Sequence, residues 1–120
     1  MSTWASFMVR GIIKNHPRWR ESMDVTILLG SSSDLPIAQK CTKILEHFDV
    51  PYQLRVASAH RSPKFVEQIV GDAIDDGCSV FIAMAGLAAA LPGAVAALTT
   101  KPVIGVPCGG RVPYDSLLSI

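Results

Sequence analysis

The sequence is short of charge, of cysteine and of long apolar runs. Charged residues make up 18% of the 120 residues and the formal net charge is +1, which argues against nucleic acid as a main partner. No apolar run approaches the roughly 18 residues that a membrane helix needs, so we predict a soluble chain without a membrane partner. Cys41, Cys78 and Cys108 are scattered and odd in number. They match neither a zinc site nor a disulfide framework, and they indicate a reducing, cytoplasmic compartment.

Residues 1–23 differ from the rest of the chain. Four of them are cations against a single acid, and their apolar residues keep no steady period. We interpret them as an N-terminal extension, poorly ordered, outside a domain that occupies residues 24–120. A cleaved targeting peptide is an alternative, because the segment is basic and poor in acids, but it has few serines and no long apolar stretch. In a further alternative, the protein proper begins at Met23.

From Asp24 onward, strand-like and helix-like patterns alternate. The expected strands are Val25–Leu29, 52–57, 79–85 and 102–107, and the expected helices are 34–48, 63–76 and a short one ending near Leu98. Such alternation predicts an α/β domain with a parallel sheet of at least four strands in a three-layer αβα arrangement. Strands 1, 3 and 4 are continuous apolar runs, which predicts that helices cover them on both faces.

Two polar loops are expected at the carboxyl ends of the first two strands. The loop Gly30–Asp34 gathers hydroxyls and free N–H groups at a helix N-terminus, which is typical of an anion site. Simple capping by Ser33 or Asp34 explains it equally well. The second loop carries Ser58, His60 and Arg61, where a guanidinium could bind a phosphate and an imidazole could carry a proton. A solvated loop histidine is the alternative.

The two later loops offer less chemistry. The stretch 85–93 has no ionisable side chain, so it can supply only backbone groups and close approach, or simply start a helix packed on the sheet. The loop after the fourth strand adds the positively charged Arg111 at the rim of the expected site. Cys108 lacks an evident base beside it, so we do not assign it as a nucleophile.

Five motifs together resemble one known family, over about residues 25 to 120. They are Gly30-Ser-Ser-Ser-Asp-Leu-Pro36, Ser58-Ala-His-Arg-Ser-Pro63, Ala85-Gly-Leu-Ala-Ala-Ala-Leu-Pro-Gly93, Thr99-Thr-Lys-Pro-Val-Ile-Gly-Val-Pro107 and Asp115-Ser-Leu-Leu-Ser-Ile120. The chain is similar to the aminoimidazole ribonucleotide carboxylases and N-carboxyaminoimidazole ribonucleotide mutases of purine biosynthesis. The resemblance implies a flavodoxin-like fold, a homo-octamer, a small ribonucleotide substrate, and carboxyl transfer without metal or organic cofactor.

The resemblance also implies roles for residues of the loops. Ser31 and Arg61 hold the 5′-phosphate with Ser58 nearby, Asp34 engages the ribose hydroxyls, and His60 carries the proton. Further contacts with the substrate complete the expected site, and they are Ser33, Ala59, Gly86 and Ala88.

Two features depart from the family pattern. Mutases typically have a second histidine where this chain has Ala90, while the carbon-dioxide-using branch has alanine there but differs at 87–89. Family members also continue past Ile120 through a long helix, so we expect a domain truncated at its C-terminus. The alternative function is therefore a catalytically silent, nucleotide-binding or subunit-like member.

Overall fold

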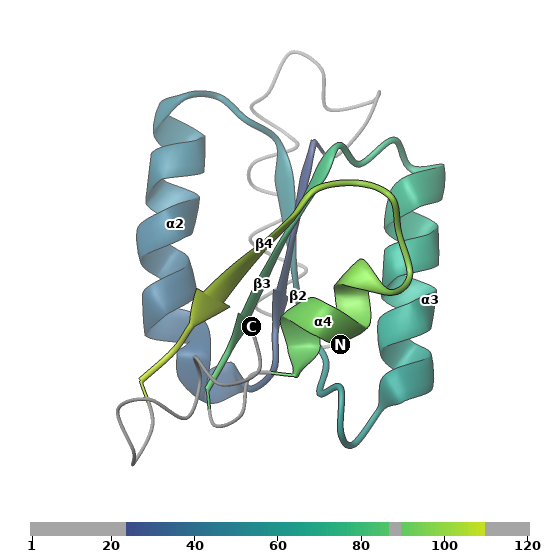
Figure 1. Cartoon of the computed structure of the whole chain (residues 1–120). Helices are drawn as coiled ribbons and strands as arrows, with labels where there is room; N and C mark the ends of the chain where they lie inside the picture. Colours follow the sequence, from purple (N-terminus) through teal and green to yellow (C-terminus); the bar gives the residue numbers. More distant parts are fainter. Residues whose placement is uncertain (1–23, 87–89, 110–120) are drawn as a thin grey trace.

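A computed structural model describes residues 24–86 and 90–109 of the chain (Figure 1). In chain order the elements are β1 (Val25–Leu29), the 3-10 turn η1 (Ser32–Asp34), α2 (Leu35–His47), β2 (Tyr52–Val56), α3 (Pro63–Asp75), β3 (Val80–Ala85), α4 (Leu91–Ala96) and β4 (Val103–Pro107). Each expected strand and helix in these residues is present, and the ends differ from the prediction by two residues or fewer. The predicted flavodoxin-like α/β class is confirmed.

The four strands form one parallel sheet in the order β2-β1-β3-β4. β1 lies inside the sheet, where Val25 pairs with Tyr52 of β2 on one side and with Val80 of β3 on the other. All five residues of β1 are buried, as expected for a strand covered on both faces. Because every strand is parallel, the loops that follow them meet at one edge, which we call the carboxyl edge.

Helices cover the two faces of the sheet unequally (Figure 1). α3 and α4 pack on one face, where the buried cluster includes Leu28, Val66 and Phe81. On the other face, α2 is the one helix among the described residues, and it packs over a second cluster that includes Ile27, Ala38 and Leu54. None of the helices in the described residues is long and apolar enough to cross a membrane.

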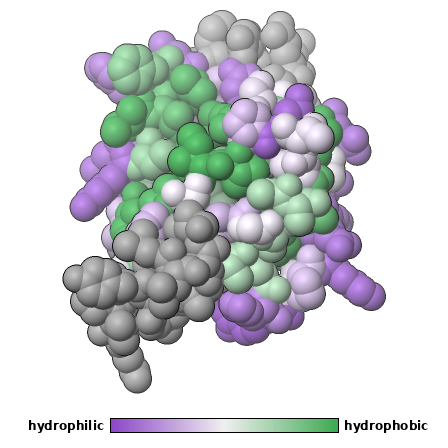
Figure 2. Space-filling model, viewed as in Figure 1, coloured by the Kyte–Doolittle hydropathy of each residue, from purple (hydrophilic) through white to green (hydrophobic). Residues whose placement is uncertain are grey.

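The prediction that strand 4 is covered on both faces is wrong for the residues that the structure describes. Ile104 of β4 is 52% exposed, and no residue of β4 is fully buried. Among the described residues β4 is the outermost strand on its side of the sheet, and α2, the one helix described on that face, contacts β1. The apolar run of β4 therefore contributes to the surface (Figure 2).

Several expectations concern residues outside those described. They are the order of the extension 1–23, the role of Arg111 and the motif from Asp115 to Ile120. These remain predictions.

Candidate functional site

The first polar loop forms a tight turn after β1. The N–H of Gly30 donates to Met84 O over 2.9 Å, which fixes the loop against β3. Ser31 is the N-cap of η1, and its Oγ accepts hydrogen bonds from the N–H of Ser33 over 3.3 Å and from the Oγ of Ser33 over 2.9 Å. The alternative that a side chain caps this turn is therefore confirmed, but the capping residue is Ser31. Neither Ser33 nor Asp34, the two residues that we had expected, caps a helix through its side chain.

This pair of hydrogen bonds leaves the Ser31 hydroxyl able to act as a donor. A hydroxyl has two acceptor lone pairs and one proton, and both contacts from Ser33 use the acceptor side. The proton of Ser31 remains available to a ligand at the carboxyl edge. A donor at the start of a helical segment suits an anionic group.

The second polar loop follows β2 and lies beside the first. The N–H of Ala57 donates to Leu29 O over 2.8 Å, so the loop begins next to the end of β1. Ser58 then closes the turn, because its Oγ accepts from the Arg61 N–H over 3.2 Å and its carbonyl accepts from the Ser62 N–H over 2.9 Å. The side chains of His60 and Arg61 are exposed at this turn. The structure thus brings the two predicted loops to the same edge.

The remaining predicted site residues differ in what they can offer. Ala59 is partly buried against the core cluster under α3, so its side chain is a packing group and only its backbone can face a ligand. At Gly86 a Cβ atom would lie 3.4 Å from Cys108 O. The close approach expected of this glycine is therefore to the loop after β4. Ala88 lies outside the described residues.

Asp34 has a partner that the sequence did not reveal. The residue is only 8% exposed, and its carboxyl group lies near the Cys108 thiol, whose Sγ donates to Val106 O over 3.8 Å. Burial raises the pKa of Asp34, and the hydrogen bond from Cys108 partly offsets that rise. Burial and the nearby carboxylate raise the pKa of Cys108 to about 11. The thiol is thus a hydrogen-bond donor, in agreement with its exclusion as a nucleophile.

The arrangement can bind a small anionic ligand and move a proton. Hydroxyls come from the loop after β1, a cation and an imidazole from the loop after β2, and a buried carboxyl acceptor from the start of α2. In open parallel sheets, ligands bind in the crevice outside the carboxyl ends of the strands, where the strand order reverses. Here β1 leads to β2 on one side and neighbours β3 on the other. The fold and these loops define an open, parallel α/β protein with a polar site at the carboxyl edge of its sheet.

Comparison with known proteins identifies the family. Residues 24–120 match the family model described as AIR carboxylase, and the chain belongs to that family. It is 55% identical over 96 residues to the N5-carboxyaminoimidazole ribonucleotide mutase of Methanocaldococcus jannaschii, covering 79% of this chain and 59% of that protein. It is 56% identical over 96 residues to a probable N5-carboxyaminoimidazole ribonucleotide mutase of Methanobrevibacter smithii, covering 79% of this chain and 28% of that protein.

A solved structure supports the same assignment. The fold matches the crystal structure of Treponema denticola PurE with a TM-score of 0.71 at 31% identity, covering 80% of this chain and 64% of that one. The chain therefore spans less than two thirds of the length of each of these three relatives. The resemblance stated from the five motifs is confirmed at the level of family.

Proposed function

We propose that this chain transfers a carboxyl group to the imidazole carbon of aminoimidazole ribonucleotide in purine biosynthesis. Family membership supports the reaction class, since the relatives are named as mutases and carboxylases of this ribonucleotide. The observation that carries the proposal is local. The Ser31 hydroxyl, held as a donor by Ser33, and the exposed His60 and Arg61 lie on adjacent loops at one edge.

The binding roles follow from the chemistry of each group. The Ser31 hydroxyl and the Arg61 guanidinium bind the 5′-phosphate, because a hydroxyl donor and a forked cation both complement phosphate oxygens. Ser58 holds the turn that presents Arg61. Asp34 accepts hydrogen bonds from the ribose hydroxyls. Backbone groups of Ala59 and Gly86, with Ser33 and Ala88, line the same site.

His60 carries the proton of the reaction. The ring carbon attacks the carboxyl carbon and forms a carbon–carbon bond, which leaves that ring carbon with both a hydrogen and the new carboxylate. Loss of the proton to the imidazole returns the electron pair to the ring and restores aromaticity. Histidine suits this step because its side chain exchanges a proton near neutral pH.

The carboxyl donor is either the N-carboxy form of the substrate or carbon dioxide. In the mutase reaction the bond from the exocyclic nitrogen to the carboxyl carbon breaks and that nitrogen gains a proton, which balances the proton that the ring carbon loses. Carboxylation instead consumes carbon dioxide directly and releases that proton. Ala90, at the start of α4, offers no second imidazole. The enzyme works in the cytoplasm as a homo-oligomer, an octamer as in the family, and the chemistry requires no cofactor.

Turnover of both substrates by the purified chain tests the proposal. We expect carboxylated product with wild type, no turnover with His60→Asn, and binding of the ribonucleotide by both in calorimetry. His47→Asn is the matched control, because His47 is exposed at the far end of α2. Binding without turnover by wild type would instead establish the silent, nucleotide-binding alternative. Turnover that survives His60→Asn would refute the role of His60.

A further inference from the structure

Arg55 and Phe65 join the two segments that flank the second polar loop. Arg55 lies near the end of β2, and Phe65 lies in the first turn of α3. The Cζ atom of the Arg55 guanidinium lies over the ring of Phe65, 5.7 Å from the ring centroid. A guanidinium within about 6 Å of a ring face is attracted to that face by a cation–π interaction. The contact therefore connects the strand before the loop to the helix after it.

The surroundings of Arg55 strengthen this contact. The Nε atom of Arg55 is buried and has no hydrogen-bond partner among the described residues. A buried donor without a partner lowers stability, and the attraction of the guanidinium to the ring of Phe65 offsets part of that cost. Cation–π interactions are also stronger where water is excluded. Phe65 in turn is partly buried against the core cluster under α3, which fixes the position of its ring.

Hydrogen bonds fix the shape of the loop between these two residues. The N–H of Ala57 anchors the start of the loop to β1. Ser58 then accepts from the N–H groups of Arg61 and Ser62, which closes the turn on itself. The far end of this turn is the start of α3. The position of that helix start therefore decides where the exposed side chains of His60 and Arg61 lie.

The start of α3 lacks a side-chain cap. Ser62 is the N-cap residue, but its side chain makes no capping hydrogen bond. The N–H groups of Phe65 and Val66 donate to the Ser62 carbonyl over 3.1 Å each. A side-chain cap ordinarily stabilises the first turn of a helix. In its absence, the contact of Phe65 with Arg55 takes on more of the task of holding the helix start in place.

We propose that Arg55 and Phe65 are positioning residues for the loop that carries His60 and Arg61. Their contact holds the first turn of α3 against the end of β2 and keeps the loop in the arrangement that receives the ribonucleotide. The consequence for catalysis rests on the proposed function, whereas the effect on the loop concerns the domain without substrate.

Loss of the contact should weaken substrate binding more than it slows the chemical step. The loop then occupies its receiving arrangement for a smaller fraction of the time, and the apparent affinity falls by that fraction. A phosphate bound to Arg61 draws the loop back, so the saturated enzyme still places His60 correctly. We expect a KM about 3- to 10-fold higher, which corresponds to the strength of a cation–π contact. The kcat should stay within about twofold of wild type.

Hydrogen exchange tests the positioning role without substrate. Arg55→Met keeps the apolar stem and removes the cation, whereas Phe65→Leu keeps an apolar side chain and removes the ring. In both variants the protection factors of the Ser62 and Val66 amides should fall about 3- to 10-fold, because the turn opens more often. The double variant should lose no more than the larger single loss, since the two residues share one contact. Phe65→Tyr keeps the ring face and should behave like wild type.

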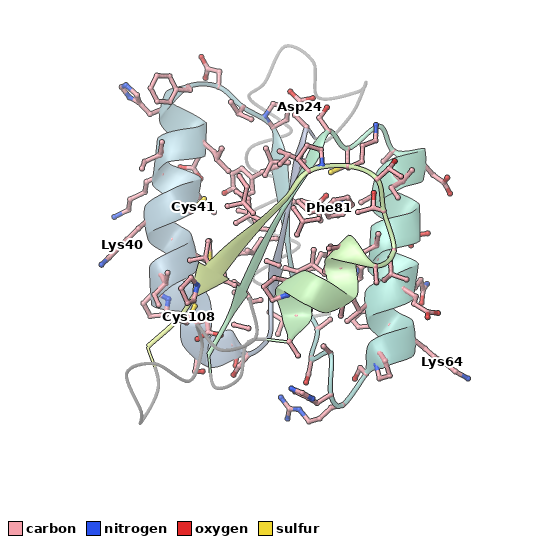
Figure 3. The ribbon with its side chains drawn as sticks, viewed as in Figure 1. Asp24, Lys40, Cys41, Lys64, Phe81 and Cys108 are labelled. Carbon is pink, nitrogen blue, oxygen red and sulfur yellow. The ribbon has the colours of Figure 1, made fainter. Side chains whose placement is uncertain are left out.

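Two further variants separate this role from general effects of charge and stability. Lys64→Met is the matched control, because it removes an exposed cation from the same turn of α3. Figure 3 shows Lys64 pointing away from the domain. Tyr52→Phe loses the hydrogen bond to Glu46 at the opposite end of β2. It should lower the Tm, and neither variant should change the protection of Ser62 or the KM.

The outcomes distinguish the positioning role from the proposed function. Unchanged protection in Arg55→Met and Phe65→Leu, additive losses in the double variant, or an equal loss in Lys64→Met would each overturn the positioning role. A lower kcat with unchanged KM would overturn it as well. Wild type that neither binds nor converts aminoimidazole ribonucleotide would refute the proposed function alone, because the protection factors would still decide the role of Arg55 and Phe65.

Discussion

The hydroxyl of Ser33 donates to the hydroxyl of Ser31 over 2.9 Å, so that Ser31 keeps its own proton for a ligand. Ser31→Ala should weaken ribonucleotide binding about 10- to 100-fold, because it removes a hydrogen bond to a charged group worth about 1.5–3 kcal/mol. Ser33→Ala removes only the contact that orients Ser31, and we expect a loss of about threefold or less, which is at the low end of the net value of one hydrogen bond. Calorimetric titration of both variants measures the difference. Equal losses would contradict the donor role of Ser31.

Asp34→Asn should stabilise the fold at neutral pH while weakening substrate binding. Burial raises the pKa of Asp34 in the folded state above its usual 3.8. Its contribution to stability is therefore present below pH 3.8 and is lost as pH rises through the folded pKa. The variant lacks this loss, so its free energy of unfolding should exceed that of wild type at pH 7 and converge with it toward pH 4.

Urea unfolding as a function of pH measures this effect. Asp72→Asn serves as the control, because Asp72 is exposed on α3. A variant that is less stable than wild type at pH 7, with the control unchanged, would show that Asp34 stabilises the domain as a carboxylate.

Tyr52→Phe should lower stability without affecting the site. The buried Tyr52 hydroxyl bonds to Glu46 at the amino edge, away from the loops that bind substrate. Its removal should cost about 1 kcal/mol, which for a domain of this size is about 4–8 °C in Tm. Glu46→Gln keeps an acceptor oxygen and should cost less. Thermal unfolding and an activity assay test both points.

The same tyrosine predicts behaviour at high pH. Burial and the neighbouring Glu46 raise the pKa of Tyr52 above its usual 10.0. Ionisation is thus easier in the unfolded chain, and wild type should lose stability relative to Tyr52→Phe as pH rises above 10. Parallel unfolding curves for the two proteins across this range would disprove the assignment.

Cys108→Ala should leave the chemistry intact. A thiol with a pKa of about 11 is protonated at neutral pH and is a poor nucleophile. We expect turnover within about threefold of wild type, a weaker affinity for the ribonucleotide because Asp34 loses its donor, and a small drop in stability from the lost buried contact. Single-turnover kinetics separates the rate of the chemical step from substrate binding. Loss of the chemical step with unchanged affinity would show that the Cys108 thiol takes part in the chemistry.

The sequence predicted the elements well because their signals are local. Pro63 at the first turn of α3 and Gly77 after its last turn mark the ends of that helix, and the observed α3 agrees. The arrangement of Ser31 and Ser33 was harder to predict. Several neighbouring hydroxyls can cap the same turn, and only the backbone conformation of Ser31 decides among them.

Properties that depend on distant segments could not be predicted in this way. The exposure of Ile104 follows from strand order and from the absence of a second helix over β4 among the described residues, neither of which a strand-like pattern encodes. The contact between Asp34 and Cys108 joins the first and fourth strand ends. The expectation that His60 and Arg61 share an edge with Ser31 succeeded because parallel strands bring their loops together.

The burial of β1 between β2 and β3 has a consequence for the order in which the chain becomes ordered. β1 precedes both partners in sequence, and each pairing closes a long loop, so neither ladder is a local event. Successive N–H groups of β1 donate alternately to the two neighbouring strands, so the amides of Ile27 and Leu28 are held by different ladders in the centre of the sheet. They should therefore exchange at the rate of global unfolding, whereas amides of β4 exchange through local opening of the outermost strand. The slowest-exchanging amides of the domain should therefore lie in its first strand, directly before the loop that carries Ser31.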